Sequence, residues 1–178
     1  MRLTAMIAAA GVVGLMPLAA VAQSMPPASN ANCAAMDANL PADLAGWSDR
    51  TPLAAATKAS GLGKATLAPG KGYEASLPMT PEVAYVTQPE KPGGTVSHGG
   101  MFGLSINKAG TYVIALSSGA WIDVLKDGKP LVSTAHARGP ECSTLRKMVD
   151  FPLQAGRYVL QVSANADPSL RLMLARRP

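Results

Sequence analysis

Two stretches in the C-terminal half of this chain repeat one short pattern. KAGTYVIALSSGA begins at Lys108 and QAGRYVLQVSANA begins at Gln154, so both run Ala-Gly-x-Tyr-Val into alternating residues. One face of each stretch collects apolar side chains, which are Tyr112, Ile114 and Leu116 in the first and Tyr158, Leu160 and Val162 in the second. The opposite face of the second stretch carries Arg157, Gln161 and Ser163. This period of two predicts two strands, each buried on one face and solvent-exposed on the other, and each glycine favours a tight turn before its strand.

Other short alternating runs predict further strands around this repeat. Asp127-Gly128 is a strong hairpin signal and is expected to join a strand over 121–126 to one over 130–135. Further along, Val149, Phe151 and Leu153 alternate with Met148, Asp150 and Pro152. In the last strand we expect Leu172 and Leu174 to point inward and Arg171 to be exposed.

Two upstream runs, EVAYVT from Glu82 and MFGLSIN from Met101, complete the set of predicted strands. They bring the total to roughly eight or nine, separated by Gly, Pro, Asn or Asp. The fold class that we expect is therefore all-β, an antiparallel, jelly-roll-like β-sandwich with an extended N-terminal leader.

The first residues predict export from the cytoplasm. MRLTAMIAAAGVVGLMPLAAVAQS places one arginine before an apolar run and ends it in small residues, which is typical of a secretory signal peptide cleaved after Ala22. No later stretch approaches the roughly 20 apolar residues of a transmembrane helix. We expect a signal peptide over 1–22, an extended or irregular leader over 23–72 packed on the domain with Trp47 as its buried anchor, and a β-sandwich domain over 73–178. A periplasmic or secreted location follows.

The chain has only two cysteines, Cys33 and Cys142. Outside the cytoplasm paired cysteines oxidise, so we predict a disulfide that fastens the leader to the sandwich. Two free thiols, or a lipid on Cys33, are the alternatives. A lipid-bearing cysteine would stand at the cleavage point itself, and Cys33 lies well beyond it.

The charge balance says little about partners. The formal net charge is +5, and the basic excess of the mature chain falls within 138–178. Such an end can attract anionic polymers or lipid head groups of the envelope, although an ordinary solvated surface is the commoner use. Aromatic residues make up 4% of the chain and no groove-reading motif is present, so nucleic acid is not an expected partner.

The sequence offers one set of residues for a metal centre. The only histidines are His98, in SHGG, and His136, in TAHARG, and Glu141 is the nearest carboxylate in sequence. Two histidines and one carboxylate can hold Fe(II) with positions left open for oxygen. Two histidines on ordinary loops are the simpler interpretation, in which the protein has no cofactor.

The methionines raise a second possibility, the handling of copper. Six remain after the predicted cleavage, namely Met25, Met36, Met79, Met101, Met148 and Met173. They are scattered along the chain and not clustered, which is typical of ordinary core and surface residues.

Residues 100–174 resemble the pre-peptidase C-terminal domain, a small β-sandwich appended to many secreted bacterial enzymes. Ala109-Gly110-Thr111-Tyr112, the strand 122–125, the Asp127-Gly128 turn and Ala155-Gly156-Arg157-Tyr158 follow that family's order. The whole chain is also similar to small exported bacterial proteins sometimes labelled homogentisate 1,2-dioxygenase. The known enzymes of that name are larger cupin-fold proteins whose carboxylate lies between the two histidines. Here the order is His98, His136, Glu141, so none of their motifs carries over.

Three functional hypotheses follow. The first is a noncatalytic, exported binding or accessory protein that engages an envelope component or another protein as a monomer. The second is a metal-dependent, Fe(II) dioxygenase-like enzyme that uses His98 and His136. The third is a periplasmic metal carrier.

Overall fold

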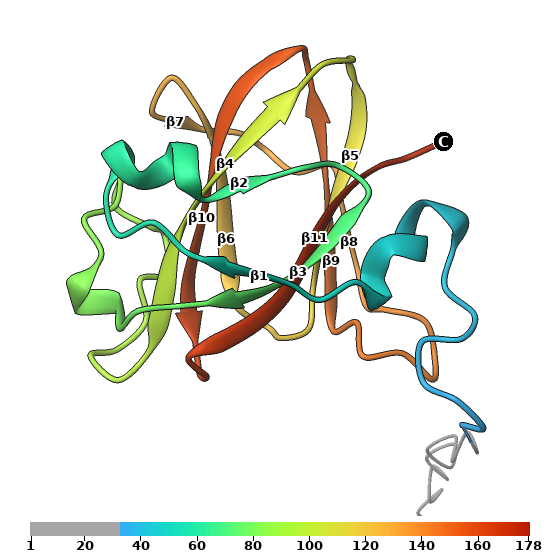
Figure 1. The fold of residues 1–178 in the computed structure, drawn as a ribbon. Helices are drawn as coiled ribbons and strands as arrows, with labels where there is room; N and C mark the ends of the chain where they lie inside the picture. Colours follow the sequence, from blue (N-terminus) through green and yellow to red (C-terminus); the bar gives the residue numbers. More distant parts are fainter. Residues whose placement is uncertain (1–32) are drawn as a thin grey trace, which may run out of the picture. The chain divides into compact units, whose positions relative to one another are not determined.

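Strand pairing divides residues 33–178, the part of the chain that the computed structural model describes, between two sheets (Figure 1). Sheet A has the order β1 (Thr51–Ala54), β3 (Lys71–Ser76), β11 (Ser169–Arg176), β5 (Gly110–Leu116), β9 (Lys147–Leu153), β8 (Ala135–Ala137). Sheet B has the order β2 (Thr66–Leu67), β4 (His98–Ile106), β10 (Gly156–Asn165), β6 (Trp121–Lys126), β7 (Lys129–Pro130). Three short 3-10 helices are η1 (Ala42–Ser48), η2 (Ala59–Lys64) and η3 (Thr80–Glu82). The predicted signal peptide and its cleavage site after Ala22 lie outside the described residues.

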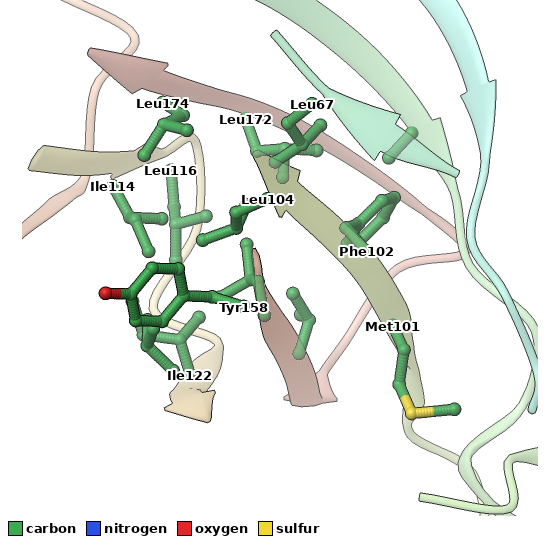
Figure 2. Close-up of a cluster of buried hydrophobic side chains, with 14 of the residues drawn as sticks. Leu67, Met101, Phe102, Leu104, Ile114, Leu116, Ile122, Tyr158, Leu172 and Leu174 are labelled. Atoms are coloured by element: carbon green, nitrogen blue, oxygen red, sulfur yellow. The ribbon is translucent and has the colours of Figure 1, made fainter. Parts of the chain in front are cut away.

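The main core lies between the two sheets, which confirms the all-β sandwich. Both copies of the repeated pattern contribute their predicted apolar faces to it, together with the inward residues of β9 and β11. Figure 2 shows this cluster, with Leu104 and Tyr158 from sheet B close to Ile114 and Leu116 from sheet A. Each fully buried aliphatic side chain contributes roughly 1.5–3 kcal/mol relative to exposure.

The repeated tyrosines explain the Ala-Gly-x-Tyr spacing. The Tyr112 hydroxyl donates to the Lys108 carbonyl at 2.8 Å, and the Tyr158 hydroxyl donates to the Gln154 carbonyl at 2.9 Å. Each ring is buried while its hydroxyl reaches the backbone four residues earlier, which satisfies a polar atom at the edge of the core. In Figure 2 the hydroxyl oxygen of Tyr158 points away from the apolar cluster.

The predicted hairpin at Asp127-Gly128 is confirmed, but its second strand is short. Asp127 has φ 51° and Gly128 has φ 75°, the left-handed pair that a type I′ turn requires. Strand β7 ends at Pro130, and the chain then crosses to sheet A, where β8 pairs with β9. The single strand expected over 130–135 is therefore divided between the two sheets.

Each sheet is mixed, because short strands from the predicted leader pair in parallel near its edge. Strand β1 runs parallel to β3, and β2 runs parallel to β4. The sequence predicted an extended or irregular leader up to residue 72, and residues 51–54 and 66–67 instead form sheet. None of the helices formed by residues 33–178 has the length and hydrophobicity that crossing a bilayer requires.

The outer face of sheet A is covered by η1, which corrects one expectation. Strand β5 was expected to be solvent-exposed on the face opposite Tyr112, yet Val113 and Ala115 on that face are buried. They belong to a second apolar cluster of Leu44, Trp47, Val113, Ala115, Leu145, Met148, Met173 and Ala175. Trp47 lies at the centre of this cluster and is 0% exposed, in agreement with its predicted role as an anchor.

Candidate functional site

The loop that joins β8 to β9 is tied to the leader by the Cys33–Cys142 disulfide, as predicted. Asp37 reinforces the link, because its carboxylate accepts hydrogen bonds from the Thr144 amide and hydroxyl, each at 2.6 Å. Its amide donates to the Cys142 carbonyl at 2.8 Å. The disulfide is compatible with an oxidising, exported location.

Arg171 belongs to the same junction and corrects the prediction that it is exposed. Its side chain is only 12% exposed and lies over the Trp47 ring, 5.5 Å from guanidinium carbon to ring centroid. It donates to the Thr144 hydroxyl at 2.8 Å and pairs with Asp37 at 3.6 Å. Burial, aided by the charge of Arg50, lowers the pKa of Arg171. Its contacts hold the leader in place, so we assign Arg171 a structural role.

The three residues predicted as metal ligands lie on separate elements. His98 begins β4 of sheet B, whereas His136 lies in β8 at the edge of sheet A. The His136 ring lies 3.1 Å from the Ser133 hydroxyl (Nε2 to Oγ), and Glu141 lies in the loop that leads to β9. Both histidines were expected on loops, yet their backbones pair with neighbouring strands.

Within residues 33–178 no three His, Cys, Asp or Glu side chains are grouped so that they could hold a metal ion. The set of His98, His136 and Glu141 therefore does not fit the two-histidine, one-carboxylate iron site.

Residues 83–97, here called the strap, cover part of the outer face of sheet B. Tyr85 donates its hydroxyl to the Val162 carbonyl at 2.8 Å, and burial raises the pKa of Tyr85 to about 12. The Thr87 amide donates to the side chain of Gln161 at 3.1 Å, and that side chain donates back to the Thr87 carbonyl at 2.9 Å. The Ser163 hydroxyl donates to the Lys91 carbonyl at 2.8 Å.

These bonds correct two predictions. Gln161 and Ser163 were expected to face solvent and are instead buried beneath the strap. The run from Glu82 to Thr87 was expected to be a strand, but it forms part of η3 and the start of the strap. Its backbone bonds differ from a sheet ladder, because the Ala84 amide donates to the Thr57 carbonyl and the Thr87 amide to a side chain.

A charged cluster joins the strap to β6 and β9. Trp121 donates its indole N–H to Asp123 at 3.0 Å, and the ammonium groups of Lys91 and Lys147 lie 4.5 and 5.3 Å from the centre of its ring. Burial raises the pKa of Asp123, although the bond from Trp121 opposes the rise. Burial and the charge of Lys91 lower the pKa of Lys147.

Sheet B also carries a groove with a volume of ≈ 570 Å³. By strand register, Gly103 and Leu125 flank Val159 on neighbouring strands. The groove is lined by Leu62, Gly63, Thr66, Gly103, Leu104, Ser105, Leu125, Asp127, Gly128, Arg157, Tyr158 and Val159. Its lining combines an apolar surface with a few polar groups, as small-molecule sites do.

Among residues 33–178, Arg157 is the only cation in the lining of this groove. Its side chain is exposed, and among residues 33–178 its guanidinium has no hydrogen-bond or ion-pair partner. The alternation in the sequence already placed Arg157 outward. No local pattern in the sequence indicated that η2 and the β6–β7 turn would form the walls around it.

Comparison with known proteins gives no family for this chain. No protein-family model matches the sequence, and no curated protein matches it either. The resemblances to the pre-peptidase C-terminal domain and to the labelled dioxygenases remain predictions.

Proposed function

We propose that this protein is an exported, noncatalytic binding protein of the bacterial envelope, and that the groove of sheet B holds its ligand. The observation that carries the proposal is the groove itself, because its ≈ 570 Å³ lies within the range of ≈ 300–1,000 Å³ typical of ligand sites. The signal-peptide pattern and the Cys33–Cys142 disulfide support export.

The lining favours an elongated apolar ligand that ends in a carboxylate. Leu62 and Val159, which are both partly exposed, supply aliphatic surface, and Ser105 supplies a hydroxyl beside Arg157 in the strand register. The guanidinium of Arg157 has no partner among residues 33–178 and is suited to a carboxylate, which it can bind through two parallel hydrogen bonds. Tyr158 is buried, so its ring offers no exposed face on which a sugar would stack.

Calorimetric titration of the full disulfide-bonded chain with dodecanoate tests the proposal. We expect saturable binding, with the fatty acid recovered unchanged. Arg157→Gln should weaken it about tenfold or more, since hydrogen bonds to charged groups contribute about 1.5–3 kcal/mol. Arg176→Gln is the matched control, because Arg176 is also exposed and lies outside the groove.

A second variant blocks the groove without removing a charge. A Cβ atom added at Gly63 meets no atom within 4 Å, and Gly63 lines the groove, so Gly63→Phe should fold normally and occupy the groove. Gly119 has equally open surroundings outside the groove, and Gly119→Phe should bind like the unmodified chain. If Gly63→Phe and Arg157→Gln both bind dodecanoate with unchanged affinity, the ligand binds outside the groove. If the unmodified chain does not bind dodecanoate, the proposal is wrong.

A further inference from the structure

Met79 and His98 face each other across an isolated antiparallel bridge away from the groove. The Thr80 amide donates to the Ser97 carbonyl at 2.8 Å, and the Gly99 amide donates to the Pro78 carbonyl at 3.0 Å. These bonds lie on either side of the Met79–His98 pair, so the pair itself is of the non-hydrogen-bonded kind. In such pairs the Cα atoms are about 4.5 Å apart and the two side chains come closest.

The His98 ring has an unexplained polar atom. Its Nδ1 is buried and has no hydrogen-bond partner among residues 33–178. Buried polar atoms nearly always have a partner, and an unsatisfied one calls for an explanation such as an ion. The thioether of Met79, on a residue that is 41% exposed, is the side chain directly opposite.

We propose that Met79 and His98 bind Cu(I), with the Met79 sulfur and the His98 Nδ1 as protein ligands. A thioether is a soft ligand that selects Cu(I), and imidazole also suits copper. Copper at Nδ1 would satisfy the lone pair that the fold leaves unpaired. Binding involves no redox step, since the ion arrives and stays as Cu(I).

The other methionines described between Cys33 and Pro178 are less suited to this role. Met101, Met148 and Met173 are buried in the two apolar clusters. Met36 is 51% exposed, but it lies in the leader and outside the strands. His136 is exposed and pairs with Val149, not with a methionine. Met36 and His136 are therefore matched controls for the two proposed ligands.

An anaerobic titration of the full disulfide-bonded chain with Cu(I), in competition with a chromophoric Cu(I) chelator, measures the affinity. We expect about one Cu(I) per chain, with affinity lowered about tenfold or more in Met79→Leu and in His98→Gln. Met36→Leu and His136→Gln should bind like the unmodified chain. X-ray absorption at the copper edge should show sulfur and nitrogen neighbours, and the sulfur should be lost in Met79→Leu.

If His98→Gln does not fold, Met79→Leu still tests the proposal. Met79→Leu should fold, because Met79 is exposed and contributes to neither apolar cluster. The proposal is overturned if the chain does not retain Cu(I) against the chelator. It is also overturned if the Met36 and His136 variants lose as much affinity as the Met79 variant, or if the sulfur neighbour persists without Met79. The groove lies on other residues, so either site can fail while the other stands.

Discussion

The two outer faces of this sandwich are covered in opposite ways. On sheet A, η1 buries Trp47 and Leu44 against the apolar outward side chains of β5 and β11, and the disulfide fixes the segment that precedes η1. On sheet B, the strap is held to β10 by hydrogen bonds to Gln161, Ser163 and the Val162 carbonyl. Its apolar contacts are fewer, with Val83 buried in the main core and Tyr85 partly buried against it. The first cover resembles a second core, and the second resembles a bound loop.

The difference shows how one fold can keep one face closed and leave a site on the other. Apolar area removed from water contributes roughly 25 cal/mol per Å², so opening the sheet A cover exposes a costly surface. A hydrogen bond to the strap contributes only about 0.5–1.5 kcal/mol net, because water replaces it on opening. The groove lies on the face with the weaker cover.

The largest effect that we expect is on the sheet A cover. Trp47→Ala should lower the free energy of unfolding by about 3–5 kcal/mol, because it removes the fully buried centre of the second apolar cluster. Urea denaturation measures the loss. Trp121→Ala is the matched control on the other face, where the indole is only half-buried, and its loss should be clearly smaller. Equal losses would mean that the two covers do not differ as described.

A smaller effect is expected at the strap. Gln161→Leu removes both hydrogen bonds to Thr87 and should cost about 1–3 kcal/mol. Amide hydrogen exchange should then speed up at Thr87 while the amides of β10 stay protected. Gln154→Leu is the control, since the side chain of Gln154 is exposed. Unchanged exchange at Thr87 would show that other contacts hold the strap.

The smallest effect is a pH dependence near the strap. The pKa of Asp123 is raised in the folded chain. As pH rises, Asp123 therefore ionises in the unfolded chain before it ionises in the folded chain. The stability contribution of Asp123 then falls as pH rises from about 3.8 through the folded pKa. Asp123→Asn removes this loss, so the variant should gain stability relative to the unmodified chain between pH 3 and 7. Urea midpoints of both proteins over that range measure it. A constant difference across the range would contradict the raised pKa.

Much of the main core could be predicted from the sequence, because period-two alternation depends only on neighbouring residues. Tyr112 and Tyr158 lie inward as expected, and two cysteines allow a single pairing. The sequence does indicate that both faces of β5 are buried. Val113 and Ala115 make the run apolar on both faces, which is typical of a strand buried on both sides.

The candidate sites were much harder to predict. Gln161 is buried because the distant Thr87 backbone satisfies its amide, and a polar residue in an alternating strand carries no sign of that. The groove depends on η2 approaching β4, and the Met79–His98 pair depends on a single bridge. Such non-local contacts follow from the assembled fold and not from a local pattern.

The position of β11 in sheet A has a consequence for how the protein is made. The C-terminal strand lies between β3 and β5, and it is the neighbour that joins them. Without residues 169–176, β3 and β5 share no neighbouring strand, and sheet A is two unconnected halves. Each half then presents an unpaired strand edge, which is the feature that promotes wrong pairing between chains. Pairing of β11 with both β3 and β5 is therefore the step that completes sheet A and removes these two edges.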